Sequence, residues 1–326
     1  MFPIAKTGLI DKRAVGTLVG LLQSERVQIV HTHNGRTHLN AALAVRRAGK
    51  GHCIATQHFI APDHSTHRRA KAWLYGRAHG WVNRHTAGFI AVSQAVRQAM
   101  LDRLEAPAER ITVVPNGIDM PELSGLQQRA DVRSDLGIAF DAPLVACIAR
   151  LEKEKDIASL IAAFRRIVTE LPAAKCIVAG EGSLRAPLKK LIGDLALDES
   201  VHLLGFRGDA HALMLAADVV VLPSLAEPFG LVILEAMALG RPVAATRAGG
   251  PMEIVVDGMT GLLANPADPI SLASVLLRLL GCPEEAARMG AAGLLRYQER
   301  YQSGHMAEAT LQVYLRVTRA SHGVSQ

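Results

Sequence analysis

Residues 227–235 read EPFGLVILE, and this stretch is the strongest functional signal in the chain. It follows Val219–Pro223, a short β-branched run that is typical of a buried strand, and it leads into a predicted helix over Leu231–Leu239. Glu235 is the only polar residue of that helix, so we predict a helix that is apolar on every side. A carboxylate in such a helix cannot be a solvated surface charge, and we expect Glu235 to meet hydroxyl groups or a cation.

The start of this helix has the features of an anion-binding site. Glu227 lies at the carboxyl end of the predicted strand, where open α/β sheets bind their ligands. Gly230 allows a ligand close to the first turn, whose N–H groups and dipole favour an anion. Two carboxylates around such a helix start indicate a sugar phosphate or a nucleotide sugar. The alternative is a buried helix in which one glutamate pairs with a core arginine.

The composition excludes several classes of protein. The 326 residues are 49% hydrophobic but only 4% aromatic, which predicts the aliphatic interior of parallel sheets. No apolar run is long enough to span a bilayer and Met1–Arg13 lacks a signal-peptide core, so we expect a cytoplasmic protein. The four cysteines are far apart and read as reduced packing residues. A net charge of +6 favours anionic partners.

Strand-like runs alternate with helical ones in two successive blocks, which predicts two Rossmann-like, doubly wound parallel sheets. The predicted strands of the first block are Val27–His33, Cys53–His58, Gly88–Ser93 and Arg110–Asp119. Those of the second block are Leu144–Arg150, Lys175–Gly180, Val201–Gly205, Val219–Pro223 and Arg241–Thr246. The polar segment Met120–Pro143 separates the blocks. We predict domains over 1–120 and 121–305, with a last helix and tail, 306–326, that pack back on the first.

Arg150 and Lys155 are the candidate cations for a diphosphate. Both lie in a predicted loop after a strand, in the sequence RLEKEKD, where they could neutralise a diphosphate leaving group without a metal. The chain has no Asp-x-Asp cluster that would hold a divalent ion. We expect this polar loop to be exposed, so that losing either cation leaves the fold intact. The alternative is a solvated charge run that includes Glu152 and Glu154.

Nine of the thirteen histidines precede residue 90, and three of them are close in sequence. His31, His33 and His38 allow a zinc site, but no cysteine is near and no H-E-x-x-H spacing occurs. Histidines at strand–loop junctions over a ligand cleft are the preferred interpretation. His58, at the exit of a predicted buried strand, is the most prominent single residue, with a packing or capping role as its alternative.

Two further segments give weaker signals. Gly180 and Gly182 follow a strand, but Arg185 stands where a dinucleotide fingerprint needs its third glycine, which argues against an NAD site. The segment His67–His85 interleaves five cations with two tryptophans, which fits a helix on an anionic membrane or an ordinary surface helix. The remaining positive charge is dispersed, which argues against nucleic-acid binding.

Together these motifs resemble the retaining glycosyltransferases of family 4, which have the two-domain GT-B fold. EPFGLVILE is similar to the E-x7-E element of that family, and ARLEKEKD is similar to its paired Arg and Lys. The motifs TQH, AVSQAVRQ, VVPNGID, GEGSLR, LLGFRGD and AGGPMEIV follow in the family's order, and the resemblance runs from Val27 to Leu315.

The resemblance implies a role for each candidate residue. Arg150 and Lys155 would bind the donor diphosphate, with the amides of Phe229, Gly230 and Leu231 and the loop of Gly180 and Gly182 beside it. Glu235 would hold the ribose and Glu227 the hydroxyls of the transferred sugar. Arg207 would lie beside the base, and His58 near the sugar and acceptor. No metal or cofactor is implied; the expected donor is a UDP- or GDP-sugar.

The implied reaction is sugar transfer with retention to a glycan or lipid-linked acceptor, at the inner face of an anionic membrane. Family members begin with two further strands and a glycine-rich loop, so we expect an incomplete first domain. This leaves two alternatives: a non-catalytic sugar-nucleotide-binding subunit, or a sugar phosphorylase or synthase on the same scaffold.

Overall fold

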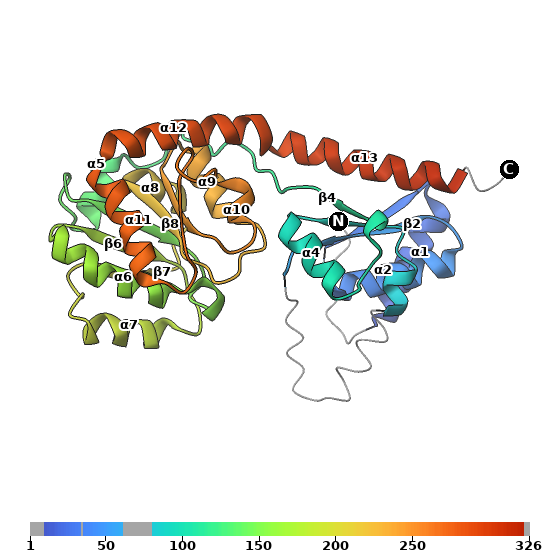
Figure 1. Ribbon diagram of the computed structural model, residues 1–326. Coiled ribbons are helices and arrows are strands. Elements are labelled where there is room, and N and C mark those ends of the chain that lie inside the picture. Colours follow the sequence, from blue (N-terminus) through green and yellow to red (C-terminus); the bar gives the residue numbers. More distant parts are fainter. Residues whose placement is uncertain (1–9, 34, 61–79, 323–326) are drawn as a thin grey trace. The chain divides into compact units, whose positions relative to one another are not determined.

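The computed structural model describes residues 10–33, 35–60 and 80–322, which form two compact α/β units (Figure 1). Unit 1 comprises Met1–Pro115 and Met306–Gln326, and unit 2 comprises Asn116–His305. Each unit contains one parallel sheet, which confirms the predicted fold class. None of the helices in the described residues is long and apolar enough to cross a membrane.

Unit 1 is built on a four-stranded sheet of order β1-β2-β3-β4. The strands are β1 (Ile29–Thr32), β2 (His52–Gln57), β3 (Gly88–Ala91) and β4 (Ile111–Val113). The described helices are α1 (Lys12–Ser24), α2 (Gly35–Ala48), α4 (Gln94–Asp102), the 3-10 turn η1 (Ala108–Arg110) and α13 (Ser303–His322).

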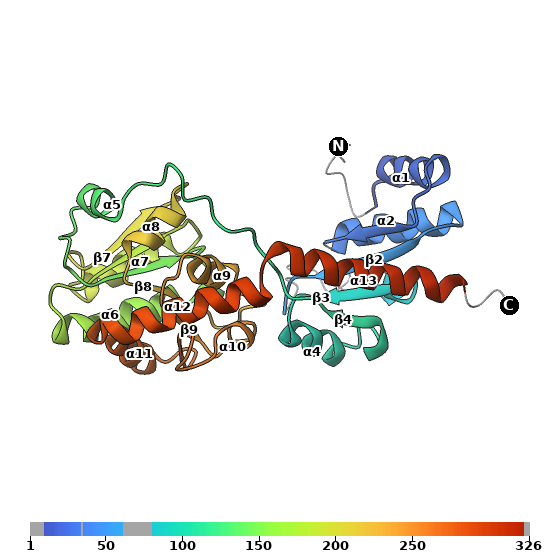
Figure 2. The same ribbon diagram turned by 90° about the horizontal axis from the view of Figure 1, so that it is seen from above.

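The period-2 alternation of the strands gives this sheet two apolar faces. Val30 and Cys53 face α2, where they pack with Leu39 and Ala42. Ile54 and Ile90 point the other way and pack against Val313 and its neighbours on α13. Figure 2 shows α13 crossing that face of the sheet. The C-terminal helix therefore completes the core of the N-terminal sheet.

Unit 2 is built on a six-stranded sheet of order β10-β9-β8-β5-β6-β7. The strands are β5 (Leu144–Ile148), β6 (Lys175–Ala179), β7 (Val201–Gly205), β8 (Val219–Leu222), β9 (Val243–Thr246) and β10 (Leu262–Ala264). The helices are α5 (Arg129–Asp135), α6 (Ile157–Glu170), α7 (Arg185–Asp194), α8 (Ala210–Ala216), α9 (Leu231–Ala238), α10 (Pro251–Ile254), α11 (Pro269–Gly281) and α12 (Pro283–Arg300), with the 3-10 turn η2 (Lys153–Lys155).

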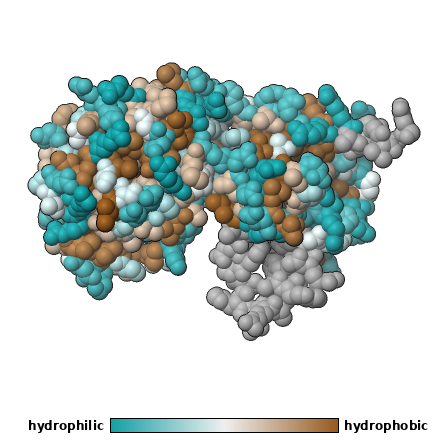
Figure 3. All heavy atoms as spheres, in the orientation of Figure 1, coloured by the Kyte–Doolittle hydropathy of each residue, from teal (hydrophilic) through white to brown (hydrophobic). Residues whose placement is uncertain are grey.

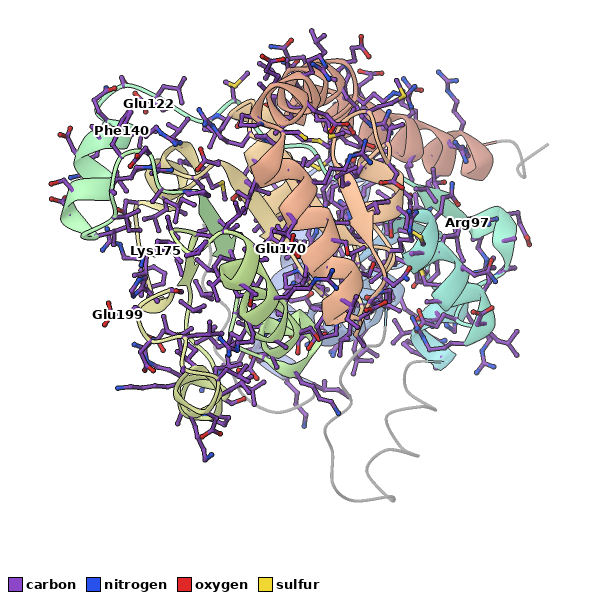
Figure 4. The ribbon with its side chains drawn as sticks, turned by 60° about the vertical axis from the view of Figure 1, so that its left-hand side comes forward. Arg97, Glu122, Phe140, Glu170, Lys175 and Glu199 are labelled. Atoms are coloured by element: carbon purple, nitrogen blue, oxygen red, sulfur yellow. The ribbon has the colours of Figure 1, made fainter. Side chains whose placement is uncertain are left out.

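Both faces of this sheet are covered, as the continuous apolar strands require. Val145 and Cys147 of β5 pack with the aliphatic side chains of α6 and α11 on one face. Leu144 and Ala146 pack with those of α5 and α8 on the other. At the amino-terminal edge, Lys175 donates to the carbonyl of Glu199, 2.6 Å away; both residues are labelled in Figure 4. The opposite, carboxyl edge is free to carry loops.

Three features differ from the expectations. The polar segment 120–143 contains α5, whose Val132 is buried in unit 2, and the short strand β10 was not predicted. The helix of EPFGLVILE is not buried on every side, because its first residue, Leu231, is 44% exposed. All four cysteines are free thiols; Cys53, Cys147 and Cys176 are buried and Cys282 is exposed.

Candidate functional site

The sheet topology of unit 2 brings the loops after β5 and β8 together. The two strands are parallel neighbours, with Val145 opposite Val219, so their carboxyl ends meet at one edge. Beyond that edge the amide of Leu225 donates to the carbonyl of Glu154 over 2.8 Å. The predicted cation loop and the EPFG stretch are therefore joined by backbone as well as by side chains.

Lys155 and Glu227 form the central contact of this edge. The ammonium nitrogen of Lys155 lies 2.5 Å from Oε2 of Glu227, and the two side chains are only 16% and 9% exposed. The buried hydroxyl of Ser224 donates to the same oxygen over 3.0 Å. The backbone of Glu227 is fixed on both sides, since its N–H donates to Ala248 and its carbonyl accepts from Gly250. The carboxylate is thus held rigidly.

This burial corrects one expectation about the cation loop. Lys155 is not an exposed loop residue that can be removed without consequence. Replacing it by alanine would leave the Glu227 carboxylate buried without its counter-charge, which destabilises proteins by about 3–5 kcal/mol.

Arg150 has a different environment from Lys155. Its guanidinium contacts Glu154 at 2.7 Å, but the side chains are 69% and 43% exposed. Exposed pairs of this kind contribute about 0–1 kcal/mol. Arg150 is therefore exposed, as we expected for this loop. It could leave Glu154 for an anionic ligand at little cost in free energy.

Gly180 and Gly182 hold the Arg150 loop in place. A Cβ on Gly180 would lie 1.9 Å from the carbonyl oxygen of Ala149, and one on Gly182 would lie 2.4 Å from that of Leu151. The two loops are further joined by Glu152, whose carboxylate accepts from the amide and hydroxyl of Ser183 at 2.9 and 2.7 Å. These bonds lower the pKa of Glu152. The glycines therefore have a structural role here, because they allow the two loops to approach closely.

The start of α9 is shaped by glycine as well. Gly230 has a φ of 108°, a left-handed conformation that side chains disfavour, and no side chain caps the helix. The N–H groups of Leu231 and Val232 in its first turn have no acceptor within the helix, whereas that of Ile233 donates to the carbonyl of Gly230 over 2.9 Å. A Cβ on Gly250 would lie 2.3 Å from Cα of Phe229, so the GGP turn also requires glycine. The uncapped start of α9 thus comes shortly after Glu227 in the chain.

Glu235 is half-buried and lies about one turn after the start of α9. Its carboxylate makes no hydrogen bond within the described residues. Burial raises the pKa of Glu235, and the nearby His211 partly offsets this. The core-arginine alternative is not supported, since no described arginine pairs with it.

Arg207 follows β7 and makes a two-point contact with Asp209. Its Nε and Nη2 lie 2.8 and 2.6 Å from the carboxylate oxygens, which raises the pKa of Arg207 and lowers that of Asp209. The preceding Phe206 is 80% exposed. The loop thus presents an aromatic ring beside a guanidinium whose position is fixed.

In unit 1 the histidines gather at the ends of β1 and β2. Nδ1 of His33 lies 3.1 Å from Nε2 of His58, and the rings are stacked at 5.4 Å. Burial, and secondarily His33, lowers the pKa of His58. His31 contacts the hydroxyls of Tyr314 and Thr56 at 2.6 and 2.7 Å. Burial, with smaller effects from the neighbouring histidines, lowers the pKa of His31 to about 4.

The zinc interpretation finds no support in the described residues. His38 bonds the buried hydroxyl of Thr86 at 2.6 Å instead of joining His31 and His33. Across residues 10–33, 35–60 and 80–322, no three His, Cys, Asp or Glu side chains gather as metal ligands would.

The structure thus brings Arg150, Lys155 and Glu227 to one edge of unit 2, and it places His58 in unit 1. Sequence reasoning missed Ser224 and Tyr314. Ser224 could have been found, because it follows a buried strand and stands three residues before Glu227. Most of the basic segment His67–His85 lies outside the described residues; Trp81 is described and lies 5.5 Å from the guanidinium of Arg46.

Comparisons with known proteins identify the family of this chain. The family described as "Glycosyl transferases group 1" matches residues 128–296, and that described as "Glycosyltransferase Family 4" matches residues 1–121. The alpha-maltose-1-phosphate synthase of Mycolicibacterium smegmatis is 31% identical over 316 residues, covering 90% of this chain and 80% of its own.

Two further relatives have names that state a ligand or a reaction. A UDP-Gal:alpha-D-GlcNAc-diphosphoundecaprenol alpha-1,3-galactosyltransferase of Escherichia coli is 28% identical, covering 82% of this chain and 70% of its own. The crystal structure of Anabaena HepE in complex with UDP superposes with a TM-score of 0.78 at 26% identity, covering 95% of this chain and 82% of HepE.

Proposed function

The chain belongs to the group 1 glycosyltransferases, and from that premise we propose that it transfers a sugar, with retention, from a nucleotide sugar to a glycan or lipid-linked acceptor. The observation that carries this proposal is the cluster of Arg150, Lys155 and Glu227 at the carboxyl edge of unit 2, beside an uncapped helix start. The reported complexes of HepE with UDP and with UDP-glucose support a UDP-sugar as donor.

The leaving group determines what these residues do. When the bond between the sugar and the diphosphate breaks, negative charge develops on the diphosphate oxygen. Arg150, Lys155 and the amides at the start of α9 are positively polarised groups that stabilise this charge. They supply it from the protein itself, and we therefore propose transfer without a divalent metal.

Retention follows if the acceptor attacks from the face that the diphosphate leaves. The acceptor hydroxyl forms the new bond to the anomeric carbon, and its proton passes to the departing diphosphate oxygen. No protein nucleophile is needed. Glu227 would hold hydroxyls of the transferred sugar, and His58 would be a candidate residue on the acceptor side.

The rest of the donor would extend along the same edge. The half-buried Glu235, which has no hydrogen-bond partner in the described residues, would accept bonds from the ribose hydroxyls. Arg207, fixed by Asp209, would lie beside the base. Gly180 and Gly182 would keep the Arg150 loop close to the phosphates.

A lipid-linked acceptor would place the protein at the cytoplasmic face of a membrane. The name of the E. coli galactosyltransferase includes a diphosphoundecaprenol acceptor, which supports this class. The basic segment His67–His85 would then contact anionic lipid, with about 1 kcal/mol for each cation near the surface.

The test is donor binding and turnover by the purified protein. Thermal shifts against UDP-, GDP- and ADP-sugars identify the base, because a ligand that binds only the folded state raises its melting temperature. Arg150→Ala should lower transfer by about 100-fold or more with an unchanged melting temperature. Glu235→Gln should weaken nucleotide binding by about 1–3 kcal/mol.

Arg166→Ala is the matched control. Arg166 forms an i,i+4 pair with Glu170 (labelled in Figure 4) that is exposed like the Arg150–Glu154 pair, but it lies on α6. This variant should transfer sugar at the wild-type rate. Wild-type turnover by Arg150→Ala would contradict the diphosphate assignment, and donor binding without any turnover would favour a non-catalytic binding subunit.

A further inference from the structure

In this structure the two groups assigned to different parts of the donor are bound to each other. Lys155 is the less exposed of the two candidate diphosphate cations, and Glu227 is the candidate ligand of the sugar hydroxyls. Their 2.5 Å contact occupies one of the three N–H donors of the ammonium and one of the two carboxylate oxygens. A diphosphate that approaches Lys155 therefore competes with Glu227 for the same positive charge.

The two partners differ in their freedom to move. Glu227 is held by Ser224 at its carboxylate and by Ala248 and Gly250 at its backbone. Lys155 has a long flexible side chain, and within the described part of the chain its hydrogen bond is to Glu227. The ammonium group is the partner that moves when a second anion approaches, and the carboxylate is the one that stays.

Loss of the cation matters because the pair is shielded from water. Side-chain exposures of 16% and 9% leave Glu227 little access to solvent, and a buried charge without a counter-charge is strongly unfavourable. The Ser224 hydroxyl is its other hydrogen-bond donor. Hydroxyl groups of a bound sugar could replace the lost ammonium, since hydroxyls bond well to carboxylates.

We propose that the Lys155–Glu227 pair competes internally with the diphosphate and makes Glu227 a specificity-determining residue, which selects a complete nucleotide sugar over the bare nucleoside diphosphate. This inference rests on the proposed function. A nucleotide sugar draws Lys155 away and supplies hydroxyls to Glu227 in exchange. A nucleoside diphosphate draws Lys155 away and supplies nothing.

The same competition would act on the product. Once the sugar has been transferred, the remaining diphosphate holds Lys155 while Glu227 has lost its hydroxyl partners. Return of Lys155 to Glu227 then favours dissociation of the nucleoside diphosphate. The ion pair would therefore reduce inhibition by the nucleoside diphosphate product, and only the Lys155 side chain would need to move.

Titration calorimetry with inorganic pyrophosphate, UDP and UDP-glucose tests the proposal on two variants. Glu227→Gln keeps the shape of the side chain and removes its charge, so Lys155 is released. We expect pyrophosphate and UDP to bind about tenfold tighter than to the wild type, while UDP-glucose binds no tighter. Ser224→Ala should act in the opposite direction: without that hydroxyl, Glu227 depends more on Lys155, and pyrophosphate and UDP should bind more weakly.

Two controls separate this effect from others. Glu170→Gln removes the same charge from an exposed pair on α6 and should leave all three affinities within about twofold. In a Lys155→Met background, Glu227→Gln should no longer tighten pyrophosphate binding, because the competing pair is already absent.

Unchanged or weaker binding of pyrophosphate and UDP to Glu227→Gln would overturn the proposal, as would tighter binding to Ser224→Ala. The pyrophosphate measurements need no nucleotide sugar. They therefore decide on the ion pair even if UDP-glucose fails to bind, an outcome that would count against a UDP-glucose donor instead. If Glu227→Gln does not fold, Ser224→Ala alone still tests the direction of the effect.

Discussion

Among the single residues, His31 has the most unusual environment in unit 1. It lies between a hydroxyl of β2 and the phenol of Tyr314 on α13, and both ring nitrogens have partners. Burial lowers the pKa of His31 to about 4, so the ring is neutral near pH 7. In the unfolded chain the same ring titrates near its ordinary value of 6.5.

This difference predicts an acid-sensitive unit 1. Between pH 6.5 and about 4 the unfolded state binds the extra proton, so stability is full above pH 6.5 and falls as the pH approaches 4. The pKa difference corresponds to about 3 kcal/mol at most. Because the ring is only partly buried, we expect about 1–2 kcal/mol. Urea unfolding at pH 7 and pH 4.5 measures this loss.

His31→Asn should abolish that part of the pH dependence, because asparagine does not titrate. His85→Asn, which removes an exposed histidine of the same unit, should keep it. Equal pH dependence in the wild type and in His31→Asn would show that another group is responsible.

Most of the candidate site residues were predicted from the sequence, but their contacts were not. Arg150, Lys155 and Glu227 were recognisable because their residue types stand at strand ends in a family-like order. That Lys155 binds Glu227 was not predictable, since the two are 72 positions apart and their contact depends on side-chain orientation. The contact of Tyr314 with His31 was not predictable for the same reason, because 283 positions separate the two residues.

At the scale of elements, α5 shows how a polar segment can become part of a core. Its Arg133 is only 1% exposed. The guanidinium donates to the carbonyls of four residues, Ala139, Phe140, Ala142 and Ala216, and to Asp218. Burial lowers the pKa of Arg133, and Asp218 opposes this. The side chain fixes the 120–143 segment against unit 2.

Arg133→Met should therefore destabilise unit 2 strongly. Methionine fills a similar volume but leaves the carbonyls and Asp218 without their donor, which predicts a loss of about 3 kcal/mol or more in the free energy of unfolding. Denaturant unfolding measures it. Arg288→Ala, an exposed arginine of α12, should change stability by less than about 0.5 kcal/mol. A similar small effect of Arg133→Met would mean that water replaces the guanidinium.

Elements with a continuous apolar run or a long helical period were predictable, whereas short elements were harder to predict. The strand β5 is such an apolar run, and the helix α6 carries its period over 14 residues. The three residues of β10 and the seven of α5 are too few to show one, and their conformation follows from packing against their neighbours. The exposure of Leu231 was missed because composition does not show which side of a helix meets the sheet.

For the whole molecule, the two units have separate apolar cores. The core of unit 1 includes Val313 and Val317 of α13, although that helix begins in unit 2, at Ser303. The candidate donor residues Arg150, Lys155, Glu227 and Glu235 all belong to unit 2. Figure 3 shows hydrophobic side chains interspersed with hydrophilic ones over the face in view.

Separate cores predict two unfolding transitions with different sensitivities. A nucleotide at 100 times its Kd adds about 2.7 kcal/mol to the unit that binds it, so UDP or the matching nucleotide should raise only the transition of unit 2. Val313→Ala removes methyl groups that are 3% exposed in unit 1, at a cost of about 1–3 kcal/mol, and should lower only the other transition by several degrees. Leu311→Ala, on the same helix but 46% exposed, is the control and should shift neither. Calorimetry of the three proteins with and without nucleotide gives the assignment. One transition that moves as a whole with either change would contradict it, because the units would then unfold as a single cooperative structure.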